Sequence, residues 1–182
     1  MDLYLVRHGE AAASWGQSAD PGLSELGRQQ AEEAASVLLP GLAPAVQLVS
    51  SPLARAQETA QPLARHLRAQ VDVNAAFAEV PSPVPLAQRQ VWLRQFMQQQ
   101  WAEQDTGLLG WRDKAYETLL DAAAPTVVFT HFLVINAVVG RIQGRAETLC
   151  FYPDNGSITH LRQSGNTLEL VELGREMETR VN

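Results

Sequence analysis

Short apolar runs that each end in a polar loop and lead into a helix-like segment constrain the fold of this chain most. Three such runs, residues 3–6, 46–49 and 126–130, are rich in strand-favouring residues. A shorter run at 71–73 is typical of an edge strand. Helix-like segments separate the runs, and this alternation is typical of a mostly parallel sheet with helices on both faces. The chain is therefore predicted to have an α/β fold.

The predicted helices follow from apolar periodicity and from residues that begin or end helices. Ser24 is a typical N-cap, and Pro62 is expected to interrupt or bend the second helix. The glycine-containing stretch 107–110 is expected to separate two helices. The expected helices are 24–39, 54–67, 86–104, 111–123 and 132–142, and two closing strands are expected at 157–162 and 167–173.

Length and composition limit the classes of protein to which the chain belongs. With 182 residues, a single domain over 1–182 is the simplest expectation. The formal net charge of −6, without a basic stripe, argues against a nucleic-acid partner. Cys150 is the only cysteine, which excludes an internal disulfide and a multi-cysteine metal cluster. No targeting segment or membrane-length apolar run is visible, so a cytoplasmic location is expected.

Candidate anion ligands follow three of the predicted strands. Arg7 and His8 come directly after the first, Arg55 after the second, and His131 after the strand at 126–130. Each residue alone would be an ordinary surface arginine or core histidine. The carboxyl ends of parallel strands meet at one edge of a sheet, however, so the four side chains are expected to converge. Two arginines supply paired N–H donors that match phosphate oxygens, and two histidines supply a nucleophile and a hydrogen-bond donor.

Phosphoryl transfer to or from an ester also needs a proton for the leaving oxygen. Glu79 lies after the third strand-like run and before a proline-rich turn, and it is the best-placed candidate acid. Its alternative roles are a surface carboxylate or an ion-pair partner of one arginine. Arginines beside the histidines would repel a divalent cation, so a metal is not expected at this site.

Five segments, in order along the chain, resemble the motifs of the histidine phosphatase superfamily, the phosphoglycerate mutase-like proteins. They are residues 3–10 (LYLVRHGE), 22–31, 50–60, 128–131 and 154–159. The resemblance implies a three-layer α/β/α sandwich with a mostly parallel central sheet. It also implies a phosphohistidine intermediate on His8, with Arg7, Arg55 and His131 around the phosphate and no metal or cofactor. The family's acid often lies where Glu79 stands.

The sequence departs from the family pattern at positions that touch the substrate. Many members carry Ser or Thr three residues after the nucleophile and Asn six after it, where this chain has Ala11 and Ser14. Phe132 follows the second histidine in place of the usual glycine. Glu10, Ser14 and Phe132 are therefore the candidate substrate contacts. The expected partner is a small phosphorylated metabolite or a phosphoprotein, and the sequence does not choose between monomer and dimer.

Four functions are compatible with this pocket, and a phosphatase that hydrolyses a phosphate ester is the leading one. The short chain is similar to compact phosphohistidine protein phosphatases, although a phosphohistidine substrate needs less help from an acid such as Glu79. A phosphoglycerate-type phosphomutase must keep water from the intermediate, and family mutases usually have insertions that this chain has little length to hold. A catalytically silent phosphate-binding scaffold would need a special reason for its loss of activity, because all the pocket residues are present.

Overall fold

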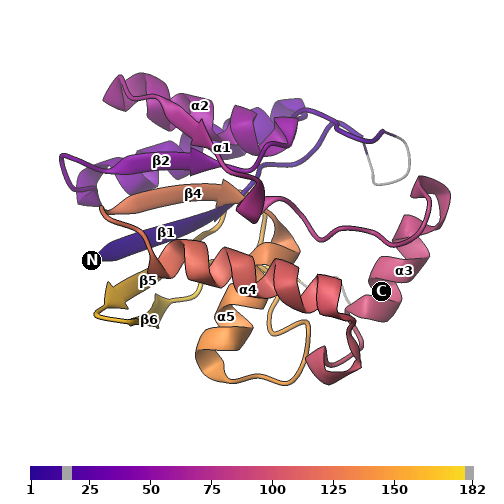
Figure 1. The fold of residues 1–182 in the computed structure, drawn as a ribbon. Helices are drawn as coiled ribbons and strands as arrows, with labels where there is room; N and C mark the ends of the chain where they lie inside the picture. Colours follow the sequence, from indigo (N-terminus) through magenta and orange to yellow (C-terminus); the bar gives the residue numbers. More distant parts are fainter. Residues whose placement is uncertain (14–17, 179–182) are drawn as a thin grey trace.

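The computed structural model describes residues 1–13 and 18–178 (Figure 1). Six strands form one sheet in the order β3-β2-β4-β1-β5-β6. Strands β3, β2, β4 and β1 are parallel, whereas β5 and β6 run antiparallel to their neighbours. The mostly parallel sheet predicted from the sequence is therefore confirmed. The strands are β1 (Asp2–Arg7), β2 (Gln47–Ser50), β3 (Val71–Val73), β4 (Thr126–Thr130), β5 (Ile158–Ser164) and β6 (Thr167–Glu172).

Helices cover both faces of the sheet, which gives the expected α/β/α sandwich. Helices α1 and α2 lie on one face, and α4 and α5 lie on the other (Figure 1). Helix α3 lies beyond the carboxyl ends of the parallel strands (Figure 1). The helices are α1 (Glu25–Leu38), α2 (Ala54–Leu67), α3 (Arg89–Phe96), α4 (Thr106–Leu120) and α5 (Phe132–Gln143). No helix of the described residues is long and apolar enough to cross a bilayer.

The core is divided by the sheet, because successive side chains of a strand point to opposite faces. Leu3 and Leu5 of β1 pack on the side of α4 and α5, whereas Val6 packs on the side of α1 and α2. A third apolar cluster, which includes Phe96 and Trp101, joins α3 to α4 and α5. The central strands are thus fixed from both sides, and their carboxyl ends form a rigid edge.

Local signals at α1 and α2 were sufficient to predict both helices. Ser24 caps α1, because its hydroxyl oxygen accepts a hydrogen bond from the Gly27 N–H at 3.0 Å. Helix α2 has the predicted bounds, Ala54–Leu67. It runs through Pro62 without ending, with that residue buried.

The single helix predicted over 86–104 is wrong. The structure has a short 3₁₀ turn (Leu86–Gln88), then α3, then a second 3₁₀ turn (Trp101–Glu103). At the end of α3, Thr148, distant in sequence, binds two carbonyls: its hydroxyl donates to the oxygen of Phe96, the last helical residue, at 2.6 Å, and its N–H donates to the oxygen of Gln99, beyond the helix, at 3.1 Å. This partner cannot be read from the local pattern.

The break predicted at 107–110 is also wrong, because α4 begins at Thr106 and includes both glycines. Asp105 is the N-cap, and its carboxylate accepts a hydrogen bond from the Leu108 N–H at 2.9 Å. A good cap outweighs the cost of about 1 kcal/mol for each glycine in a helix.

Candidate active site

The register of the sheet brings three polar residues to one point of its edge. Arg7 pairs with Thr130, so the residues that follow, His8 and His131, leave β1 and β4 side by side. Ser51 leaves β2 at the same level, where its N–H donates to the Phe129 oxygen at 2.9 Å. The His8 and His131 rings lie edge to face with their centroids 5.2 Å apart.

The His8 imidazole has a defined tautomer. Nδ1 lies 2.7 Å from the Gly9 carbonyl oxygen, which can only accept, so Nδ1 carries the proton. Nε2 therefore has a lone pair, which accepts a hydrogen bond from Arg55 Nε at 3.2 Å. Burial, followed by the charges of Arg55 and Arg7, lowers the pKa of His8 to about 3. His8 is thus neutral at physiological pH, and its free lone pair points at a guanidinium.

Arg55 lies in the first turn of α2, and the loop of His8 is tied to the same turn. The Thr59 hydroxyl donates to the Arg55 carbonyl at 2.7 Å and accepts the Gly9 N–H at 3.0 Å. On the other side, Gly9 packs directly on Gly27 of α1: a Cβ at Gly9 would lie 2.4 Å from the Gly27 oxygen. The loop is therefore held between two helices, with no space for a side chain at Gly9.

Arg7 is a partly buried cation whose hydrogen-bonding groups are only partly satisfied. Its Nη1 donates to the Pro153 oxygen at 2.8 Å, and its guanidinium lies 5.1 Å from the centroid of the Phe132 ring. Nε is buried and has no hydrogen-bond partner among the described residues. Burial lowers the pKa of Arg7 to about 10, so the group still carries its charge at neutral pH. A buried charge with an unpaired N–H favours an anion.

His131 is completely buried. Its Nε2 lies 2.7 Å from the Ser51 hydroxyl oxygen, and its Nδ1 has no partner among residues 1–13 and 18–178. Burial, together with the charges of Arg55 and Arg7, holds the pKa of His131 well below its usual value. This ring too is neutral at physiological pH.

Glu79 lies in the loop after the 3₁₀ turn Ala75–Phe77, and it is neither a surface carboxylate nor a direct ion-pair partner of an arginine among the described contacts. Its two carboxyl oxygens accept the Val80 N–H at 2.9 Å and the Leu133 N–H at 3.4 Å. Burial raises the pKa of Glu79, although these two N–H groups and the arginine charges oppose the rise. A buried carboxyl with a raised pKa can hold a proton near neutral pH.

A cavity of about 170 Å³ adjoins Glu79. Arg55 and Arg89 contribute cationic groups to its wall, and Leu53 and Leu86 contribute apolar ones. Arg89 is the first residue of α3, and its Nη2 donates to the Val80 oxygen at 3.1 Å. Arg89 was missed at the sequence level, since it lies in the part of the chain outside the recognised motifs.

The candidate substrate contacts have different environments. The Glu10 carboxylate accepts the Ser24 hydroxyl at 2.8 Å, so the side chain is engaged with the start of α1. Phe132 packs beneath Arg7 and lies edge to face with Tyr152 at 5.9 Å between centroids. Ser14 lies outside the described residues.

Three supporting residues were also missed: Ser51, Thr59 and Asn155. The Asn155 amide donates to the His8 carbonyl at 3.0 Å. Ser51 directly follows a predicted strand, and its polar character at that position was the available signal. Thr59 and Asn155 carried no signal apart from their places in the recognised motifs.

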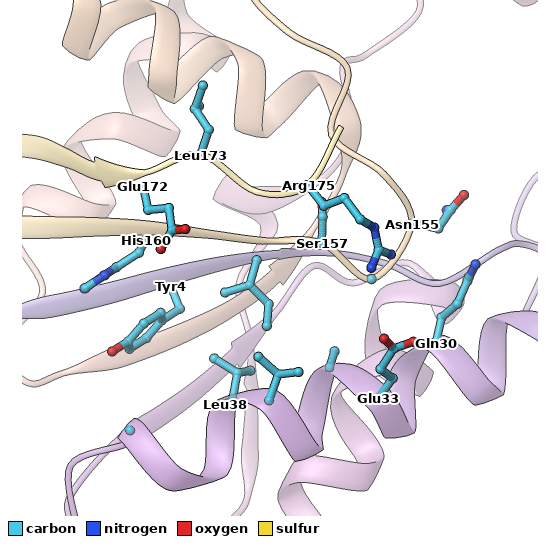
Figure 2. Close-up of a pocket in the computed structure, with 15 residues that line it drawn as sticks. Tyr4, Gln30, Glu33, Leu38, Asn155, Ser157, His160, Glu172, Leu173 and Arg175 are labelled. Atoms are coloured by element: carbon cyan, nitrogen blue, oxygen red, sulfur yellow. The ribbon is translucent and has the colours of Figure 1, made fainter. Parts of the chain in front are cut away.

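A larger groove, of about 380 Å³, lies between α1 and strands β1, β5 and β6 (Figure 2). Tyr4 and Leu38 form part of its apolar wall, while Gln30 and Asn155 lie at the end nearest the His8 loop (Figure 2). None of the four predicted phosphate ligands lines this groove. In the part of the chain that the structure describes, no group of three or more His, Cys, Asp or Glu side chains is arranged to hold a metal ion.

Comparison with known proteins defines the class of this fold and site. The model of the histidine phosphatase superfamily (branch 1) matches residues 3–176, and the chain belongs to this superfamily. No curated protein sequence matches the chain.

Solved structures with the same fold include two phosphatases. A phosphoserine phosphatase from Entamoeba histolytica, in complex with 3-phosphoglyceric acid, is 23% identical with a TM-score of 0.75, and the match covers 97% of this chain and 98% of that one. A mycobacterial glucosyl-3-phosphoglycerate phosphatase in complex with VO₃ is 23% identical with a TM-score of 0.71, over 94% and 98% of the two chains. The phosphoglycerate mutase-like fold expected from the sequence is thus confirmed.

Proposed function

We propose that this protein is a phosphatase that hydrolyses a phosphate ester through a phosphohistidine intermediate on His8. One observation carries the proposal: the neutral His8 ring directs its Nε2 lone pair at Arg55, inside a buried pocket that holds a second cation, Arg7. A phosphoryl group bound by both guanidiniums would place its phosphorus in front of that lone pair. Positioning and electrostatic stabilisation of this kind account for most of the catalysis of phosphoryl transfer.

The first step forms the phosphohistidine. Nε2 of His8 attacks phosphorus, the bond from phosphorus to the ester oxygen breaks, and Glu79 gives its proton to the departing oxygen, which leaves as an alcohol. The Arg55 N–H that occupies the lone pair in the free protein moves to a phosphoryl oxygen. The Nδ1–H···O=C bond to Gly9 keeps the ring oriented and stabilises the positive charge that the ring gains.

The second step hydrolyses the intermediate. The Glu79 carboxylate takes a proton from a water molecule, the water oxygen attacks phosphorus, and the bond from phosphorus to Nε2 breaks. Inorganic phosphate leaves, and His8 and Glu79 return to their starting states. No metal takes part in either step.

The cavity beside Glu79 supports a small phosphorylated metabolite as the substrate. It adjoins the candidate acid and has room for a compact leaving group between Leu53, Leu86 and Arg89. Two structural neighbours, a phosphoserine phosphatase and a glucosyl-3-phosphoglycerate phosphatase, fit this class of substrate. Burial raises the pKa of Glu79, which suits a proton donor and therefore favours an ester over a phosphohistidine protein, whose leaving imidazole needs less protonation. It also favours a catalytic protein over a silent scaffold, which has no use for such a group.

Replacing the nucleophile tests the proposal. His8→Ala is expected to reduce the hydrolysis of p-nitrophenyl phosphate about 10³-fold or more, because it removes the proposed nucleophile. The control is His66→Ala, which removes a histidine of α2 that binds only the Pro62 carbonyl in its own helix. Turnover retained by folded His8→Ala would refute the assignment. Transfer of the phosphoryl group to an added alcohol or phosphoglycerate, in preference to water, would indicate a mutase.

The acid is tested with leaving groups of different basicity. Glu79→Gln is expected to slow hydrolysis of an alkyl phosphate about 10²-fold or more, because an alkoxide leaves poorly without a proton. The loss with p-nitrophenyl phosphate should be much smaller. Because burial raises the pKa of Glu79, the wild-type rate on the alkyl ester should fall as the pH rises through that pKa. Equal losses on both esters would remove Glu79 from this role.

A further inference from the structure

The Ser51 hydroxyl lies between two nitrogen atoms. Its oxygen is 2.7 Å from His131 Nε2, and it accepts a hydrogen bond from the Leu53 N–H at 3.2 Å. Ser51 and His131 are both fully buried. Each proton in this small network must therefore find its acceptor among the protein groups themselves.

Two arrangements of the protons are compatible with these distances. In the first, the Ser51 hydroxyl donates to His131 Nε2, and the imidazole proton is on Nδ1. In the second, Nε2–H donates to Ser51, whose own hydrogen then has no acceptor, because the Leu53 N–H is itself a donor. The second leaves two groups unpaired among the described residues, the hydroxyl hydrogen and the Nδ1 lone pair. The first leaves only the Nδ1–H unpaired, and each buried unpaired group is costly.

We infer that Ser51 is a positioning residue that fixes the proton of His131 on Nδ1, so that this buried N–H donates to an oxygen of the bound phosphoryl group. The inference rests on the proposed function and deepens it. Nδ1 of His131 and Nε of Arg7 are both buried and unpartnered in the described parts of the chain, and both belong to residues that surround His8. An anion in front of His8 would pair with both.

His131 then acts as a neutral donor, and the charge of the pocket is left to the two arginines. A neutral N–H can bind a phosphoryl oxygen without offering it a mobile proton, so the oxygen stays anionic while negative charge shifts during the transfer. Fixed donors of this kind stabilise the transition state more than the ground state. Losing the correct tautomer should therefore lower kcat more than it raises KM.

The tautomer is measured directly by NMR of the protein labelled with ¹⁵N in its histidine rings. In the wild type, His131 is expected to show a protonated Nδ1 and an unprotonated Nε2, with the signals assigned by their loss in His131→Gln. Addition of inorganic phosphate should shift the Nδ1–H proton resonance. In Ser51→Ala, Nε2 loses its donor, and the Nε2–H tautomer should become populated. The kcat for an alkyl phosphate should fall about 10- to 100-fold, the range for a hydrogen bond to a charged group.

Matched variants separate this role from a general effect on folding. Ser50→Ala removes the neighbouring buried hydroxyl, which donates to the Ser51 carbonyl oxygen and does not contact His131, so the wild-type tautomer should persist. Ser51→Thr keeps the hydroxyl and should keep the tautomer as well. If Ser51→Ala does not fold, the wild-type spectrum still decides between the two arrangements.

Two results would overturn the inference: an Nε2–H tautomer of His131 in the wild type, or wild-type tautomer and kcat in folded Ser51→Ala. A failure of the proposed function is distinguishable from either. A protein without turnover on any phosphate ester, but with Nδ1–H on His131 in the spectrum, would refute the hydrolase proposal and leave the proton assignment intact.

Discussion

Lowering the pH from 7 to 5 is expected to destabilise this protein through its buried histidines, and His8 offers the clearest test. The pKa of His8 falls from about 6.5 in the unfolded chain to about 3 in the folded protein. Below pH 6.5, His8 therefore binds a proton in the unfolded chain but not in the folded protein. The stabilising contribution of neutral His8 is present above pH 6.5 and is lost progressively as the pH falls toward 3.

The size of the effect follows from linkage. Between pH 6.5 and pH 5, the free energy of unfolding should fall by about 1.4 kcal/mol for each pH unit, or about 2 kcal/mol from His8 alone. His131 acts in the same direction, because burial lowers its pKa too. Glu79 acts in the opposite direction, since burial raises its pKa and its protonated form is favoured in the folded state.

The assay compares urea unfolding at pH 7 and pH 5 for the wild type and His8→Gln. Because the glutamine does not titrate, the variant should lose about 2 kcal/mol less than the wild type between the two pH values, whatever its stability at pH 7. Titrating groups that do not interact with His8 cancel in this difference. The control, His66→Gln, keeps both pocket histidines and should keep the wild-type loss. Equal losses for the wild type and His8→Gln would show that the folded protein does protonate His8, and would refute the neutral-nucleophile reasoning.

Two further predictions concern the packing of the His8 loop and the independence from metal. Gly27→Ala should lower the free energy of unfolding, measured in urea, by about 1–3 kcal/mol, because its Cβ would lie 2.1 Å from the Glu10 carbonyl oxygen. The matched control is Gly110→Ala, at a position of α4 where an added Cβ meets no atom within 4 Å. A Gly27→Ala variant more stable than the wild type would contradict the close packing. Hydrolysis of p-nitrophenyl phosphate should persist after dialysis against excess EDTA, and a loss restored only by added divalent cation would show that a metal takes part.

The predictable part of the fold is the part determined by local signals. Ser24 identifies the start of α1, and the apolar runs identify β1, β2 and β4. The convergence of His8 and His131 was also predictable, because parallel neighbouring strands in register must end together. The structure agrees, since Arg7 pairs with Thr130.

The remaining features depend on partners far away in the chain. The last carbonyl of α3 accepts a hydrogen bond from the Thr148 hydroxyl, and no property of residues 86–104 indicates this distant partner. Asp105, which caps α4, was not recognised as a cap, and the two glycines alone led to the wrong break at 107–110. At the site, the roles of Ser51 and Asn155 depend on single hydrogen bonds to His131 and His8, which the residue types alone do not determine.

Two residues from far along the chain, Pro153 and Asn155, contact Arg7 and His8. Arg7 donates to the Pro153 oxygen, and Asn155 donates to the His8 carbonyl. During synthesis on a ribosome, the first strand emerges long before these partners exist. A nascent chain would therefore lack both contacts to this region until residues 153–155 have been made and docked. Because the region carries the proposed nucleophile, truncation before residue 153 should abolish turnover although Arg7, His8, Arg55 and His131 are all retained.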